Sequence, residues 1–85
     1  MIYQERTKKD TQISIIIPTY NESQNIIKIL KSIGESLPKN IYTQAIVVDD
    51  NSPDGTGKLV EAYLKNLKKI ANYTIDVIHR TTKKD

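Results

Sequence analysis

The chain of 85 residues contains no cysteine and no tryptophan, and only three glycines and three prolines. Without cysteine, neither a disulfide nor a thiolate metal site is available, so packing alone must stabilise the fold. A chain of this length buries only about 60–65% of the surface that its unfolded form exposes, so we expect one domain of modest stability. The lack of cysteine also fits a reducing compartment.

Long apolar runs are missing as well. No apolar stretch approaches the roughly 20 residues that a membrane span requires. The first residues, MIYQERTKKDTQ, have no apolar core like that of a signal peptide. The sequence therefore predicts a cytoplasmic protein, and peripheral association with the cytosolic face of a membrane, through a partner, stays open.

Positive charge is not concentrated in any part of the chain. Thirteen basic and ten acidic residues give a net charge of +3, and the lysines are scattered along the sequence. A nucleic-acid-binding surface normally shows a denser basic stripe. A solvated, lysine-rich surface is the better interpretation, and no nucleic-acid partner is expected.

Three apolar runs predict strands, at Ile13–Pro18, Gln44–Val48 and Tyr73–His79. The first run is apolar on both faces and rich in β-branched residues, which is typical of the central strand of a covered parallel sheet. The third run alternates, with Ile75, Val77 and His79 expected on one face.

Two apolar stripes at helical spacing lie between these strands. The first stripe contains Ile26, Leu30, Ile33 and Leu37, and we expect Pro38 to end its helix. Asn21 and Gln24 resemble a capping box at the start of that helix. The second helix is expected from about Thr56, with a stripe that consists of Val60, Tyr63, Leu64, Leu67 and Ile70.

The predicted order is β-α-β-α-β, which gives three parallel strands covered by two helices, or half of a Rossmann-like sheet. Residues 1–12 are expected to form a flexible leader and residues 13–85 the domain. A sheet of this size has an exposed edge, which invites pairing with a second copy or another polypeptide.

Polar residues gather in three loops that follow the predicted strands: PTYNES, DDNSPDGTG and HRTTKKD. Ligands of open α/β sheets bind at the carboxyl ends of the strands, so these loops are the candidate site. Asp49 and Asp50 should point to opposite faces, one toward the turn and the other toward a ligand. The alternative, in which both only cap the turn and the next helix, stays open.

The other candidate residues have simple structural alternatives. Tyr20 could stack on a planar base and Glu22 accept from it, or they are an exposed tyrosine and a charge that favours the helix start. Arg80 and Lys83 could bind phosphate, or they are basic residues near a frayed end. His79 has no partner at metal-ligand spacing and is expected at the core edge or surface.

Three segments together, ISIIIPTYNESQNI, IVVDDNSPDGTG and VIHRTTKKD, resemble the N-terminal region of inverting family-two glycosyltransferases of the GT-A fold. Within that family the likeness is closest to dolichyl- or polyprenyl-phosphate mannosyltransferases. The resemblance implies a nucleotide-sugar pocket that consists of Pro18, Tyr20, Glu22, Asp49, Asp50, Arg80 and Lys83. It implies that Asp50 binds the base, that Asp49 supports the loop, and that Arg80 and Lys83 border the phosphates.

The same resemblance implies GDP-mannose, or UDP-glucose in a sister group, as donor and a polyprenyl phosphate lipid as acceptor. Complete members use Mg²⁺ or Mn²⁺ at an Asp-x-Asp motif, which this sequence lacks, so no metal site and no sugar transfer are expected of this chain alone. A second polypeptide or a longer parent would supply the rest. The alternatives are a stand-alone nucleotide-binding module and a non-enzymatic module that associates with itself through the open sheet edge.

Overall fold

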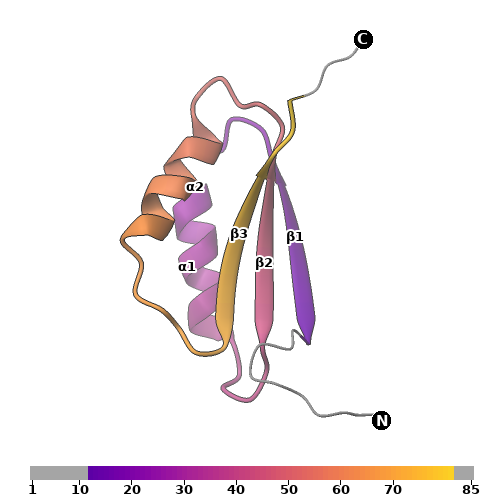
Figure 1. Ribbon diagram of the computed structural model, residues 1–85, viewed down its shortest axis with the longest axis vertical. Helices are drawn as coiled ribbons and strands as arrows, with labels where there is room; N and C mark the ends of the chain where they lie inside the picture. Colours follow the sequence, from indigo (N-terminus) through magenta and orange to yellow (C-terminus); the bar gives the residue numbers. More distant parts are fainter. Residues whose placement is uncertain (1–11, 82–85) are drawn as a thin grey trace.

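The computed structural model describes residues 12–81 and contains five elements in the predicted order. They are β1 (Ile13–Thr19), α1 (Ile26–Ser36), β2 (Thr43–Asp49), α2 (Thr56–Lys65) and β3 (Tyr73–His79). The strands form one parallel sheet in the order β1-β2-β3, and both helices pack on the same face of it (Figure 1). The predicted α/β half-sheet is therefore confirmed. The expected leader lies outside the described residues except for Gln12.

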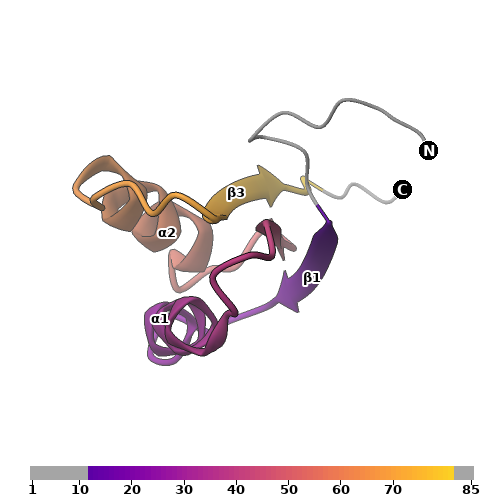
Figure 2. The same cartoon turned by 90° about the horizontal axis from the view of Figure 1, so that it is seen from below.

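The strands are paired in one register, which aligns Thr19, Asp49 and His79 in a row at the carboxyl edge. Since side chains alternate along a strand, the odd-numbered residues face the helices and the even-numbered residues face away. Figure 2 shows the sheet from its end, with α1 and α2 on one side only. The second face of the sheet is uncovered in residues 12–81.

The core lies between β2 and the two helices and contains Ile26, Leu30, Ala45, Val47, Val60 and Tyr73. The hydroxyl of Tyr73 donates to the carbonyl oxygen of Leu30 at 2.8 Å. Burial, with a smaller effect of Tyr63, raises the pKa of Tyr73 to about 12. A Cβ at Gly34 would lie 2.9 Å from the Tyr73 ring, so this glycine lets α1 approach β3 closely.

The position predicted for the first strand is wrong within the described residues. β2 is the central strand, while β1 is an edge strand that pairs with β2 alone in residues 12–81. Ile13 and Ile16 are 44% and 57% exposed. A β-branched apolar run indicates apolar surroundings on both faces, but it does not say how many strands lie beside it.

The start of α1 also differs from the prediction. The helix begins at Ile26, with Asn25 rather than Asn21 in the N-cap position. Asn21 has a left-handed backbone (φ 57°), and its Oδ1 accepts a hydrogen bond from the Asp54 amide at 3.3 Å. Its side chain is therefore used between loops, and the capping box does not form.

The other helix boundaries are close to expectation. α1 ends at Ser36, just before Pro38, and α2 begins at Thr56. Two members of its predicted stripe, Leu67 and Ile70, lie beyond its end in the connection to β3. In residues 12–81 no helix has the length and apolar character needed to cross a membrane.

Candidate functional site

Three loops meet at the carboxyl edge of the sheet, where β1, β2 and β3 end (Figure 1). The first loop comprises residues 20–25, the second loop residues 50–55, and the third loop starts at Arg80. Backbone hydrogen bonds continue past the strand ends: the Asp50 amide donates to the Thr19 carbonyl at 3.0 Å, and the Arg80 amide donates to the Asp49 carbonyl at 2.8 Å. The three loops therefore leave the sheet side by side.

Asp49 faces the helices and is only 3% exposed. Its Oδ1 accepts from Thr19 Oγ1 at 2.8 Å and from Ser52 Oγ at 2.6 Å, and its Oδ2 accepts from the Ser52 amide at 3.0 Å. Burial alone would raise the pKa of Asp49, but the Ser52 and Thr19 hydrogen bonds and the nearby His79 hold that pKa below its ordinary value. Asp49 is therefore an ionised, buried anchor of the second loop.

Asp50 faces the other way and is exposed. Its Oδ1 lies 3.8 Å from Nε of Arg80, and the two side chains are 49% and 58% exposed. The carboxylate therefore retains acceptor positions that point to solvent, beside a guanidinium. The opposite directions expected from strand alternation are observed, since Asp49 holds the turn and Asp50 points to solvent.

The first loop is held by the second through its backbone. Three consecutive amides donate to side chains: Asn21 to Ser52 Oγ at 2.9 Å, Glu22 to Thr56 Oγ1 at 2.9 Å, and Ser23 to Asp54 Oδ2 at 3.1 Å. The Thr56 amide and hydroxyl in turn both donate to Asp54 Oδ1. Hydrogen bonds from Thr56 and Ser23 outweigh desolvation and lower the pKa of Asp54.

This contact between the first two loops is not predicted from the sequence, where DDNSPDGTG indicates only a turn and a candidate ligand loop after the strand. A turn is present, since Gly55 has a φ of 80° that favours glycine. The signal that could have revealed the further role is the spacing of Ser52, Asp54 and Thr56. These are three short polar side chains at alternate positions after a buried strand.

The remaining predicted residues lie at the same edge in different settings. Pro18 is exposed on the uncovered face, and Tyr20 is 57% exposed at the start of the first loop. Glu22 is half-buried, and its Oε1 accepts from Asn25 Nδ2 at 3.4 Å. Lys83 lies outside the described residues. Of these predicted site residues, the structure brings the side chains of Asp50 and Arg80 together.

His79 lies at the surface, as expected, and connects β3 to α2. Its Nε2 is 2.6 Å from Oε2 of Glu61, and its side chain is 39% exposed. A Cβ on Gly57 would lie 2.6 Å from the His79 ring and 3.1 Å from Oδ2 of Asp49. Gly57 therefore lets the start of α2 approach the side chains of His79 and Asp49. His79 is the residue directly before Arg80.

Metal-ligating side chains do not cluster in this region. Between residues 12 and 81, no three His, Cys, Asp or Glu side chains are placed to hold a metal ion. These residues therefore do not fit a metal centre of their own.

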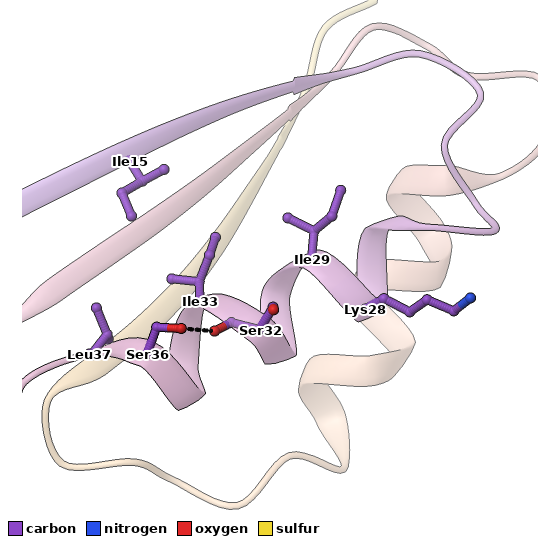
Figure 3. Close-up of a pocket in the computed structure, with 7 residues that line it drawn as sticks. All are labelled: Ile15, Lys28, Ile29, Ser32, Ile33, Ser36 and Leu37. Atoms are coloured by element: carbon purple, nitrogen blue, oxygen red, sulfur yellow. Dashed lines mark hydrogen bonds between the residues drawn. The ribbon is translucent and has the colours of Figure 1, made fainter.

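An apolar groove of about 650 Å³ lies between β1 and α1, away from the loops (Figure 3). It is lined by Ile15, Lys28, Ile29, Ser32, Ile33, Ser36 and Leu37. Ser36 Oγ donates to the Ser32 carbonyl oxygen at 2.9 Å, so one of its few polar groups is already satisfied. The groove suits apolar side chains rather than a nucleotide.

The sequence matches the family model described as Glycosyl transferase family 2 over residues 14–85. The chain therefore belongs to glycosyltransferase family 2. It is 39% identical over 69 residues to polyprenol monophosphomannose synthase of Mycolicibacterium smegmatis, and this alignment covers 81% of this chain and 23% of that protein. It is 36% identical over 73 residues to dolichol-phosphate mannosyltransferase of Pyrococcus furiosus, and this alignment covers 86% of this chain and 19% of that protein.

Among solved structures, the chain resembles the mannosyltransferase PcManGT of Pyrobaculum calidifontis, determined in complex with GDP-Man and Mn²⁺. The TM-score is 0.68 at 25% identity, over 92% of this chain and 22% of that one. This likeness confirms the GT-A-type half-sheet. The chain spans about a fifth to a quarter of the length of these relatives.

Proposed function

We propose that this chain is the nucleotide-binding part of a polyprenyl-phosphate mannosyltransferase, with GDP-mannose as donor and a polyprenyl phosphate as acceptor. The observation that carries the proposal is the difference between two adjacent aspartates. Asp49 is buried and hydrogen-bonded through both carboxylate oxygens, whereas Asp50 is exposed beside Arg80. The named relatives are mannosyltransferases that act on such lipids or bind GDP-mannose. UDP-glucose is the alternative donor.

In this proposal each predicted residue has one role. Asp50 accepts hydrogen bonds from the base, and Tyr20 stacks on it while Glu22 accepts from the base or ribose. Arg80 and Lys83 bind the phosphates, the arginine through its planar fork. Pro18 borders the pocket, and Asp49 supports the second loop from below.

The reaction proposed for the whole protein is one displacement at the anomeric carbon of the sugar. A phosphate oxygen of the lipid forms the new bond to that carbon, and the bond to the nucleoside diphosphate breaks, so the diphosphate leaves with the electron pair. The residues of this chain bind and orient the donor. Because the sequence has no Asp-x-Asp motif, we propose that Mg²⁺ or Mn²⁺ is held elsewhere in a complete enzyme and that this chain alone does not transfer sugar.

The test is a titration of the isotope-labelled chain with GDP, GDP-mannose and UDP, following backbone amide shifts. We expect shifts at residues 20–22, 49–51 and 80–83, with the guanine ligands bound more tightly than UDP. Asp50→Asn keeps the side-chain shape and should weaken binding at least about tenfold, which is the effect of losing a charged acceptor. A well-folded spectrum that no nucleotide shifts would overturn the proposal for this chain.

A second candidate is a non-catalytic module that associates with itself along β1. The unpaired edge of that strand in residues 12–81, with Ile13 and Ile16 exposed, favours this candidate. Sedimentation over a wide range of concentration distinguishes the two functions. Concentration-dependent dimers without any response to nucleotide would favour the module, whereas a monomer that binds GDP would exclude it.

A further inference from the structure

The first loop has little structure of its own to fix it. Within it the Asn25 and Ile26 amides both donate to the Glu22 carbonyl oxygen, while Asn21 has a left-handed backbone. The amides of Asn21, Glu22 and Ser23 donate instead to side chains some 30 residues away in sequence. The shape of this loop is therefore set largely by the second loop and the start of α2.

Thr56 is the centre of this contact. It is fully buried, so water does not compete for its hydroxyl. The oxygen accepts from the Glu22 amide, and its single proton is donated to Asp54 Oδ1. A hydroxyl has one donor and is used here as donor and acceptor at once, which fixes its orientation.

Asp54 completes the link from the surface side. Its Oδ1 accepts from both the amide and the hydroxyl of Thr56, and its Oδ2 accepts from the Ser23 amide at 3.1 Å. Its own amide donates to Asn21 Oδ1. Both oxygens of this carboxylate are therefore engaged, one toward the helix and one toward the first loop.

We infer that Thr56 and Asp54 are positioning residues for nucleotide binding, because they fix the loop that carries Tyr20 and Glu22. This inference rests on the proposed function. Tyr20 is 57% exposed, so few packing contacts fix its side chain. The position of its ring therefore depends on the backbone of the strand end and of the hydrogen-bonded residues that follow. A loop that is already ordered loses less conformational freedom when the ligand binds, and affinity rises accordingly.

Three variants separate this role from a general effect on folding. Thr56→Val keeps the β-branched shape but removes both hydrogen bonds, and Thr56→Ser restores the hydroxyl without the methyl group. Asp54→Asn replaces one acceptor oxygen by a donor at an exposed position. Each variant is measured as the 85-residue chain, by GDP titration and by hydrogen exchange of the Glu22 and Ser23 amides without nucleotide.

We expect Thr56→Val to weaken GDP binding about tenfold, and to speed exchange of the Glu22 amide while the amides of β2 stay protected. Thr56→Ser should restore binding to within about threefold, and Asp54→Asn should fall between the two. If Thr56→Val binds GDP as the parent does, or if Thr56→Ser binds as poorly as Thr56→Val, the inference is overturned.

Hydrogen exchange keeps this test separate from that of the proposed function. Failure of the parent chain to bind any nucleotide would count against the proposed function. The inference would then be judged by exchange alone. Faster exchange confined to the Glu22 and Ser23 amides would support Thr56 as the residue that fixes the loop, and unchanged exchange in Thr56→Val would overturn it.

Discussion

The two faces of β2 differ in what their residues do. On the face toward the helices, Thr43, Ala45, Val47 and Asp49 are all buried. On the other face, Gln44, Ile46 and Val48 are half-buried, and Asp50 follows them into solvent. The first face forms the core with the helices, whereas the second is more exposed in residues 12–81. The adjacent aspartates show this division within two residues, so an acidic pair in a sequence need not be one site.

The uncovered face is itself divided along the strands. The row nearest the amino ends is polar, and from it Gln44 Nε2 donates to Asp76 Oδ2 in the middle row at 2.6 Å. The last row before the carboxyl ends is apolar, and its Ile78 is 51% exposed. The apolar row is therefore the part of this face next to the candidate site, and apolar side chains exposed together often mark an interaction surface.

The largest effect on stability is expected from the covered face. Val47 is fully buried, so Val47→Ala removes packed methyl groups and leaves a cavity, which costs about 2–3 kcal/mol of unfolding free energy. The matched control is Val48→Ala on the other face, which should cost less than about 1 kcal/mol. Urea denaturation followed by circular dichroism measures both. Equal losses of unfolding free energy in the two variants would show that the two faces of β2 contribute equally to stability, against this prediction.

The next effect comes from the buried carboxylate. The pKa of Asp49 is lowered in the folded protein, so its contribution to stability is present above the unfolded pKa of about 3.9 and is lost as pH falls through the lower folded value. Asp49→Asn should cost about 1–2 kcal/mol at neutral pH. It should also reduce the loss of stability below about pH 4.

A stability–pH curve for Asp49→Asn and its parent, from pH 7 down to acid, checks this prediction. Some acid sensitivity should remain in Asp49→Asn, because the pKa of Asp54 is lowered as well. A parallel curve, shifted by a constant amount at every pH, would contradict the assignment of Asp49 as the ionised anchor.

A smaller loss is expected at the contact between α2 and β3. In Gly57→Ala the new Cβ meets the His79 ring at 2.6 Å, but that side chain is 39% exposed and has room to move. We expect a loss of unfolding free energy of about 1 kcal/mol, measured by urea denaturation. In a His79→Ala background the same substitution should cost much less, and a double-mutant cycle measures the difference. Additive losses would exclude the ring as the cause.

Sequence patterns predicted the order of the elements and the meeting of the three candidate loops at one edge of the sheet, because both depend on local periodicity and on the direction of the strands. The bounds of β3, the start of α2 and the opposite directions of Asp49 and Asp50 were all confirmed. The edge position of β1 and the role of Asn21 were not predicted. Both depend on residues some 30 positions away in the sequence. β1 pairs with Thr43 to Asp49, and Asn21 accepts from the Asp54 amide. A local sequence pattern does not identify such distant partners.

The smallest effect on stability should come from the exposed aspartate, and this result would sharpen the contrast with Asp49 most directly. Asp50→Asn removes only a 3.8 Å contact between half-exposed groups, so unfolding free energy should change by less than about 0.5 kcal/mol. The same variant is expected to lose nucleotide affinity. The two adjacent aspartates would then affect different properties, since Asp49→Asn would lower stability and Asp50→Asn would lower nucleotide affinity. If Asp50→Asn destabilises the chain as much as Asp49→Asn does, the acidic pair caps the turn together and the ligand-facing role fails.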